Sequence, residues 1–284
     1  MSEVLLGVDV TARGATATLV GRDGAVGKNA TGTGATALAK VLKQVGGARA
    51  ANIIGVAVEG GQEAAVQKVF GRKVPFRCSP GAAAVAAEHW VGGAQDTRDA
   101  VCLWIGDRVF AGVMLEGKPW AGAHGLAGSA AWLALNPVER QDYRKFGGLA
   151  AEVSNSGIAR RLSWRIQSGD PSSVLDRAGT LEAITAAHVF DGARAGDGVA
   201  ISVVRETAKY VAMAIVNLAC AFDPEVVVLA GELAEAGDLL MGPISQECSR
   251  RLPPAMLSQV RIERSTLGHL GVAIGAAKLA SAAA

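Results

Sequence analysis

The sequence has no excess of charge of either sign and no long hydrophobic run. Its 284 residues contain 28 Lys and Arg against 26 Asp and Glu, a formal net charge of +2. Nucleic-acid-binding domains gather basic residues into a patch or stripe, so we expect no nucleic-acid partner. No apolar run reaches the roughly 18 residues of a membrane span, and the N-terminus lacks the basic and apolar regions of a signal peptide. We therefore expect a cytoplasmic protein with no membrane partner.

Cysteine and aromatic residues are also scarce. The four cysteines, Cys78, Cys102, Cys220 and Cys248, lie far apart and form no Cys-x-x-Cys pair. We expect reduced thiols and no zinc site built from them. Aromatic residues make up only 5% of the chain, whereas hydrophobic residues make up 50%. This balance favours a buried core in which helices pack closely on sheets, and the length allows two domains.

The hydrophobic pattern alternates between strands and helices, which predicts an α/β architecture. A strand, a tight bend and a return strand occur twice, at 4–20 and 100–115, which indicates an internal duplication. We expect an N-terminal α/β lobe at 1–98 and a C-terminal α/β lobe at 99–284, with the final helix packing back on the first lobe. The expected strands are 4–9, 15–20, 53–58, 74–78, 100–105, 109–115, 225–231 and 260–263. The expected helices are 35–45, 81–90, 149–166, 185–193, 198–222 and 271–283.

Three segments of the C-terminal half carry a resemblance to a known family. They are Ile184 to Asp197, Phe222 to Gly231, and Gly268 to Ala280 with its Ile-Gly-Ala-Ala run. In order and spacing they resemble the ROK family (repressor, open reading frame, kinase), whose members include bacterial glucokinases. The resemblance implies the two-lobed actin-like ATPase (ribonuclease-H-like) fold of the sugar-kinase superfamily, with a cleft between the lobes. It also implies a homodimer.

The resemblance places nucleotide contacts at Asp9, Thr11, Gly106 and Gly231. The family's first phosphate loop, Asp-x-Gly-Gly-Thr, here reads Asp-Val-Thr-Ala-Arg at 9–13. The second, Gly-Thr-Gly-x-Gly, here reads Gly-Asp-Arg-Val-Phe at 106–110. The glycines that let backbone amides approach phosphate are largely missing, so we do not expect ATP and Mg²⁺ in the usual pose. Asp9 either holds Mg²⁺ through water or is a polar strand end that bonds the turn amides.

The family's catalytic aspartate aligns with Pro80, which has no side chain that could take a proton from a sugar hydroxyl. Glu59 follows an expected strand and is the best substitute base in the chain. The alternative is that Glu59 is a solvated loop carboxylate. Cys78 and Ser79 are expected to line the same cleft, with Cys78 an inert buried thiol. Glu59 and Ser79, together with Ser129, are the candidate substrate-binding residues.

The sugar side and the zinc site of the family have also changed. The family's Gly-Glu-x-Gly-His element aligns with 128–132, so Ser129 stands for a sugar-binding glutamate and Trp132 for the zinc-binding histidine. We expect Trp132 to fill the space of the metal with apolar contacts. The cysteine-rich loop aligns with 142–150, which contains no cysteine, and Ala150 stands for a second glutamate. A register change could instead bring Glu152 into the sugar site. We expect no zinc.

These substitutions predict a non-catalytic ligand-binding or regulatory pseudokinase with a sugar-like ligand and no required cofactor. The alternative is an ATP-dependent hexose-type kinase that uses Glu59 or Asp9 in an altered geometry. No helix-turn-helix segment precedes Val4, so we do not expect repression through DNA.

Overall fold

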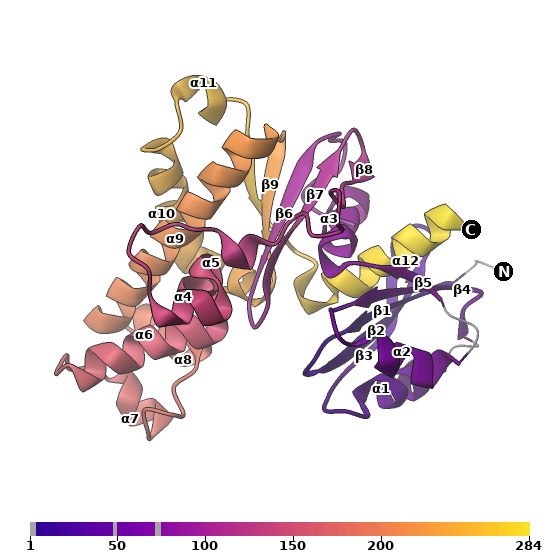
Figure 1. The fold of residues 1–284 in the computed structure, drawn as a ribbon. Helices are drawn as coiled ribbons and strands as arrows, with labels where there is room; N and C mark the ends of the chain where they lie inside the picture. The colour runs from indigo at the N-terminus through magenta and orange to yellow at the C-terminus, as the bar shows by residue number, and fades with distance from the viewer. Residues whose placement is uncertain (1–3, 48–49, 72–74) are drawn as a thin grey trace. The chain divides into compact units, whose positions relative to one another are not determined.

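The structure, a computed structural model, describes residues 4–47, 50–71 and 75–284. They form two compact units (Figure 1). The first unit is built from the chain up to Cys102, from Ala111–Gly128 and from Ser265–Ala284. The second is built from Leu103–Phe110 and Ser129–Arg264. The chain thus passes between the units four times.

The first unit contains a five-stranded sheet of order β3-β2-β1-β4-β5. Strand β1 pairs antiparallel with β2 and parallel with β4, and β4 pairs parallel with β5. Because β1 is paired on both edges and covered on both faces, its sequence is a nearly continuous apolar run. The bounds are β1 Val4–Val10, β2 Gly14–Gly21, β3 Val26–Thr33, β4 Ile53–Val58 and β5 Phe76–Cys78.

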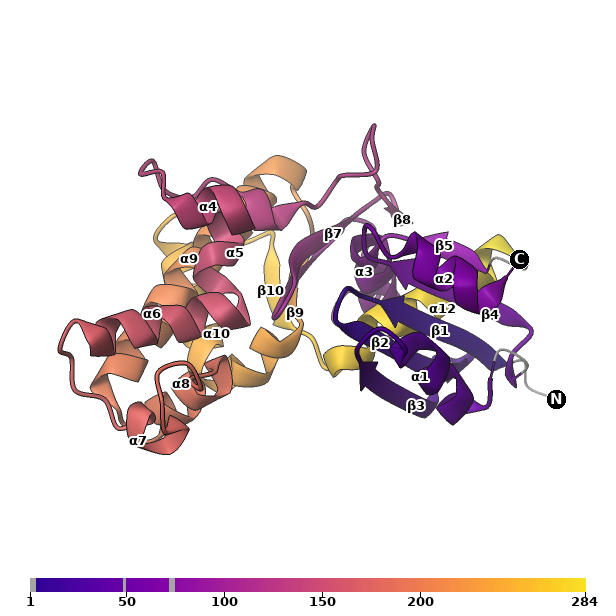
Figure 2. The same cartoon turned by 60° about the horizontal axis from the view of Figure 1, so that its bottom comes forward.

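Helices cover both faces of this sheet, because successive side chains of β1 point to opposite sides. Leu6 and Val8 pack with α1 (Ala37–Val45), whereas Leu5 packs with α3 (Pro80–Val91) and α12 (Gly271–Ala283). Figure 2 shows α1 and α12 on these opposite faces. Helix α2 (Glu63–Phe70) follows β4.

The second sheet has the order β10-β9-β6-β7-β8, and the division between the units passes through β6 and β7. Its strands are β6 Ala100–Ile105, β7 Val109–Leu115, β8 Lys118–Pro119, β9 Val226–Ala230 and β10 Arg261–Arg264. The second unit is otherwise helical. Its helices are α4 Gln141–Phe146, α5 Gly148–Val153, α6 Asn155–Gln167, α7 Val174–Ala178, α8 Ala186–Arg194, α9 Gly198–Phe222, α10 Gly237–Ser249 and α11 Pro254–Leu257.

Most of the expected elements are confirmed, and the differences have local causes. The helix expected at 149–166 is broken at Ser154, whose extended backbone and side-chain hydrogen bond from the Gly157 amide start α6. Strand β3 was not predicted because it is mostly exposed and lacks an apolar alternation. Helix α10 was not predicted because Pro243 lies inside it. Val74, in the strand expected at 74–78, lies outside the described residues. None of the described helices is long and apolar enough to cross a membrane.

A buried carboxyl group in the first unit makes folding depend on pH. Glu88 on α3 is 1% exposed and accepts hydrogen bonds from the Ser265 hydroxyl and the Gly93 amide. Burial raises the pKa of Glu88 above its usual value, and those two hydrogen bonds partly oppose the rise. The folded state therefore holds this proton more tightly than the unfolded chain does. The stability from Glu88 is complete below the unfolded pKa and is lost as the pH rises through the folded pKa.

We expect Glu88→Gln to raise the thermal midpoint at pH 7, because a neutral amide replaces a carboxylate that is costly to bury. The gain should shrink as the pH falls through the raised pKa of folded Glu88, and it should be smallest below the usual carboxyl range, where Glu88 is neutral in both states. Thermal unfolding of both proteins between pH 4 and pH 8 measures this. A difference in midpoint that does not change with pH would contradict the assignment.

Candidate functional site

In the first unit, the candidate residues gather where three parallel strands end. Asp9 on β1 is in register with Ala57 on β4, which is in register with Cys78 on β5. Carboxyl ends of parallel strands meet at one edge of a sheet, which is where α/β proteins place their ligands. Glu59 follows β4 at this edge, and Pro80 follows β5. The structure therefore brings together Asp9, Glu59 and the segment around Pro80.

The turn between β1 and β2, which resembles the first phosphate loop, is held by side chains of this chain. The Thr11 hydroxyl accepts hydrogen bonds from the Arg13 amide at 3.2 Å and the Gly14 amide at 3.0 Å. Oε2 of Glu59 accepts a hydrogen bond from the Ala12 amide at 2.7 Å. A phosphate approaching these amides would compete with a hydroxyl and a carboxylate already bonded to them.

Helix α3 begins at Pro80, the residue that the resemblance aligns with the family's catalytic aspartate. The Ser79 hydroxyl caps the helix by accepting a hydrogen bond from the Ala82 amide at 3.1 Å. Proline is favoured at the first helical position because its fixed φ suits the helix and that amide is unpaired anyway. Ser79 and Pro80 thus have a structural role as a helix start, and neither can act as a general base at neutral pH.

Cys78 is not an activated nucleophile. Burial, with the negative charge of Asp9 second, raises the pKa of its thiol from 9.0 to about 12. The thiolate that would attack a substrate is therefore disfavoured. Asp9 itself is 5% exposed at the end of its strand.

In the second unit, Gly106 and Gly231 lie at the ends of β6 and β9, as the resemblance implies. Gly231 has φ +84°, and a Cβ there would lie 2.4 Å from the Ile105 carbonyl oxygen, so only glycine fits. A Cβ on Gly106 would lie 1.2 Å from Oε2 of Glu232. The carboxylate of Glu232 therefore lies directly against the backbone of the second phosphate loop.

Glu232 interacts with this loop through charge and hydrogen bonding. Burial and the negative charge of Asp107 raise the pKa of Glu232, and a hydrogen bond from the Asp107 amide opposes the rise. Asn155 fixes the loop from the start of α6, since its amide donates to the Gly106 carbonyl at 3.0 Å and its Nδ2 donates to Oδ1 of Asp107 at 3.1 Å. Two carboxylates thus lie at the loop that the resemblance aligns with the family's second phosphate loop.

A pocket of about 780 Å³ opens beside this loop, within the size range of small-molecule sites. Its wall combines apolar groups with four carboxylates and one guanidinium. The carboxylates are Asp107, Asp191, Glu232 and Glu235, the guanidinium is that of Arg194, and the apolar groups include Ile184 and Phe190. Arg194 is already paired with Asp191 at 3.1 Å and with Asp238 at 2.8 Å. The pocket is therefore negative, which suits a neutral ligand better than a nucleoside triphosphate.

Ser129 and Trp132 were expected at the positions of the family's sugar-binding glutamate and zinc-binding histidine. Ser129 precedes the short 3-10 helix Ala130–Trp132. The expectation that Trp132 fills a metal-sized space with apolar contacts is wrong, because its side chain is 60% exposed. The indole instead borders a pocket of about 310 Å³.

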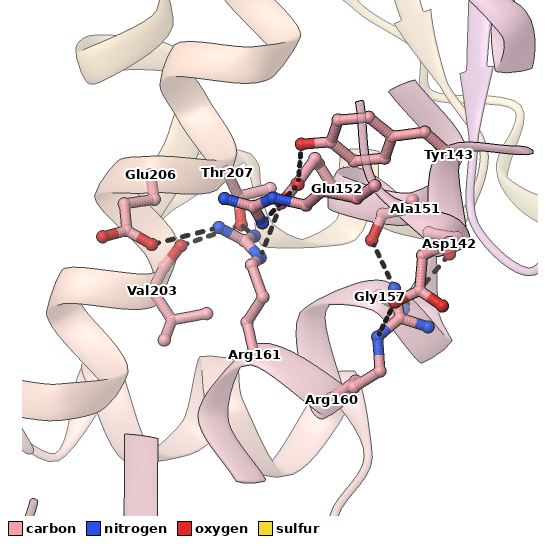
Figure 3. Close-up of polar contacts among 12 residues, drawn as sticks. Asp142, Tyr143, Ala151, Glu152, Gly157, Arg160, Arg161, Val203, Glu206 and Thr207 are labelled. Atoms are coloured by element: carbon pink, nitrogen blue, oxygen red, sulfur yellow. Dashed lines mark hydrogen bonds and ion pairs between the residues drawn. The ribbon is translucent and has the colours of Figure 1, made fainter. Parts of the chain in front are cut away.

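Glu152 is buried and paired. The residue is 4% exposed on α5, and its carboxylate accepts a hydrogen bond from the Tyr143 hydroxyl. Oε2 lies 3.7 Å from Nε of Arg161 (Figure 3). Oε1 lies 3.5 Å from Nη1 of Arg140. A carboxylate held by two cations and a phenol has little capacity left to bind sugar hydroxyls.

The zinc that the resemblance implies does not fit the residues present. The aligned loop has no cysteine, and an exposed tryptophan stands where the histidine would. Among the residues that the structure describes, no three His, Cys, Asp or Glu side chains are grouped so that they could hold a metal ion. Zinc sites require such thiolate and imidazole ligands.

The architecture and the two loops define the class of protein. A solved ROK family glucokinase from Streptomyces griseus, in complex with glucose and AMPPNP, superposes with a TM-score of 0.85. The match covers 98% of this chain and 99% of that chain at 20% identity. The protein has the α/β, two-lobed actin-like ATPase-type fold.

The sequence assigns the chain to a family within this class. A profile of the ROK family matches residues 21–283, so the chain belongs to the ROK family. A glucokinase of Halalkalibacterium halodurans is 31% identical over 197 residues, 68% of this chain and 59% of that protein. A DNA-binding transcriptional dual regulator of Escherichia coli is 27% identical over 191 residues, 67% of this chain and 46% of that protein. The matches thus span about half of these curated relatives.

Sequence reasoning missed Glu232 and Asn155. The position of Glu232 directly after Gly231, at the end of a buried strand, was a usable signal. Asn155 gave no signal, because its role depends on the break at Ser154 that starts α6.

Proposed function

We propose that this chain is a non-catalytic, ligand-binding or regulatory member of the ROK family. The proposal rests on one feature of the two loops that correspond to the family's phosphate loops. Each loop has a carboxylate of this chain against its backbone, Glu59 on the Ala12 amide and Glu232 on Gly106. Each carboxylate lies where a phosphate would approach.

The size of the expected charge repulsion and of the expected rate loss favours a protein that does not transfer phosphate over one that does so with other residues. At an effective dielectric constant of about 20, two like charges ~4 Å apart repel by about 4 kcal/mol. Loss of the general base alone costs about a hundredfold to ten-thousandfold in rate. Phosphoryl transfer relies on positioning and charge stabilisation, and both are weakened here.

The ligand that we propose is a sugar-like small molecule. Two findings support a sugar-like ligand. The chain belongs to the ROK family, and its fold is similar to that of a glucokinase solved in complex with glucose. The negative wall of the pocket of about 780 Å³ is consistent with an uncharged ligand. The transcriptional regulator among the relatives is consistent with a regulatory role.

A second candidate function is ATP-dependent sugar phosphorylation with Glu59 as the base. It is favoured by the position of Glu59 at the end of β4, on the same sheet edge as Asp9, and by the glucokinases among the relatives. Against it, Oε2 of Glu59 is already bonded to the Ala12 amide. Glu59→Gln separates the two functions, because it would abolish turnover in the kinase but not ligand binding in the pseudokinase.

We expect the double variant Glu59→Gln/Glu232→Gln to bind Mg²⁺·AMPPNP about tenfold or more tightly than the unaltered chain, because two carboxylates leave the phosphate loops. Calorimetric titration measures the affinity, and a coupled ADP-release assay with glucose, other hexoses and amino sugars measures turnover. We expect no turnover from either protein. The control, Glu63→Gln/Glu116→Gln, removes the same charge from two exposed positions that line neither loop nor the pocket of about 780 Å³. Sugar-dependent ADP release by the unaltered chain that disappears in Glu59→Gln would establish the kinase instead.

A further inference from the structure

A second cavity in the C-terminal unit, of about 490 Å³, has the opposite charge to the pocket beside Gly106. It shares no lining residue with that pocket. Four cationic side chains and two carboxylates line it. The cations are Arg140, Arg161, Lys209 and Arg251, the carboxylates are Glu152 and Glu206, and apolar contact comes from Leu135, Tyr210 and Met213.

Both carboxylates are paired with one buried guanidinium. The Arg161 side chain is 9% exposed, with Nε 3.7 Å from Oε2 of Glu152 and Nη1 3.4 Å from Oε2 of Glu206. Its Nη2 donates to the Thr207 hydroxyl, which in turn donates to the Val203 carbonyl (Figure 3). Its buried Nε has no hydrogen-bond partner among the described residues. This network thus leaves the buried Nε–H of Arg161 without a hydrogen-bond acceptor.

Three other cationic side chains, Lys209, Arg251 and Arg140, make the cavity lining positive. Lys209 on α9 makes no hydrogen bond or ion pair within the described part of the chain, although its charge lowers the pKa of Glu247. Arg251 bonds to Glu247 on α10. Arg140 lies over the Tyr143 ring at 5.6 Å, and its Nη1 is 3.5 Å from Oε1 of Glu152. The lining therefore carries two more positive charges than negative ones, and Glu247, outside the lining, offsets that of Arg251.

We propose that this cavity is a binding site for a small phosphomonoester. Such a group carries about −1.5 to −2 charges near pH 7, opposite in sign to the net charge of the lining. Guanidinium groups bind phosphate oxygens through a planar fork of donors, and lysine adds a point charge. Tyr210, Met213 and Leu135 would contact the carbon part of the ligand. The site is separate from both phosphate loops, so it does not depend on whether the chain transfers phosphate.

The test is calorimetric titration of the full chain with ribose 5-phosphate, glycerol 3-phosphate and glucose 6-phosphate. Inorganic phosphate and sulfate are the comparison probes, and ribose, glycerol and glucose show what the ester phosphate contributes. We expect at least one ester to bind more tightly than inorganic phosphate. Lys209→Gln should weaken that binding about tenfold, the effect of losing one charge-assisted hydrogen bond. The matched control, Lys40→Gln, makes the same change on exposed α1 of the first unit and should leave the affinity unchanged.

Three outcomes would overturn the proposal. They are no binding of any ester, binding of inorganic phosphate alone, and equal weakening by Lys209→Gln and Lys40→Gln. The variant Glu59→Gln/Glu232→Gln must retain the binding, because its substitutions lie in the phosphate loops. Loss of ester binding in that variant would place the ester in the phosphate loops and sink the proposal without affecting the proposed function.

Discussion

Arg161→Met is expected to destabilise the protein by about 3–5 kcal/mol, because it leaves the Glu152 carboxylate buried without its nearest buried cation. Glu206 is half-exposed and can be solvated, whereas Glu152 is 4% exposed and cannot. The substitution keeps much of the side-chain length, so loss of packing volume contributes little. Chemical denaturation with a probe in the second unit measures the change.

Two further variants test whether the loss of stability comes from leaving a charge buried or from breaking any ion pair. Arg144→Met makes the same substitution in an exposed pair, where Arg144 donates to Glu139 at 2.6 and 2.7 Å, and should change stability little. Arg161→Met/Glu152→Gln removes both buried charges and should recover most of the loss. If Arg144→Met costs as much as Arg161→Met, or the double variant recovers nothing, the explanation by burial is wrong.

Gly275→Ala is expected to destabilise the first unit by about 3 kcal/mol, although alanine normally stabilises a helix relative to glycine. A Cβ on Gly275 would lie 1.7 Å from the Ala83 carbonyl oxygen of α3, and a backbone atom cannot rotate away. Gly7 and Gly55 show the same close approach, since Cβ atoms there would lie 1.9 Å and 1.8 Å from carbonyl oxygens of α12. Helix α12 thus approaches the sheet and α3 most closely where one partner is glycine. Thermal and urea unfolding measure the loss.

Gly198→Ala is the matched control, since it makes the same change at the first residue of α9. A Cβ there would meet no atom within 4 Å, and φ is not positive. We expect a gain of roughly 0.4–1 kcal/mol, because alanine restricts the unfolded chain. Equal effects at the two glycines would show that helix propensity, not the α3–α12 contact, controls the result.

Local pattern predicted much of the fold. Helix α9 has the expected bounds because Asp197 caps it, accepting a hydrogen bond from the Ala200 amide at 2.9 Å, and Pro224 lies beyond its end. Strands β1 and β9 are apolar runs that only a sheet paired on both edges buries. The exposed strand β3 left no such signal.

For the candidate site, too, some features could be read from the sequence and others could not. The proline at position 80 and the lack of cysteine in 142–150 can be read directly from the sequence. The sequence by itself therefore led to the hypothesis that the family's base and zinc ligands are missing. The resemblance to the ROK family could also be read from segments whose order and spacing are linear, and the match to residues 21–283 confirmed it.

Only the tertiary structure decided what the remaining carboxylates do. Glu59 bonds to an amide 47 residues away, and Glu232 lies on Gly106 from a different strand. Arg161 on α6 meets Glu206 on α9 across 45 residues. The charge and pKa of a side chain depend on which groups surround it in space, and neighbours that are remote in sequence leave no local pattern.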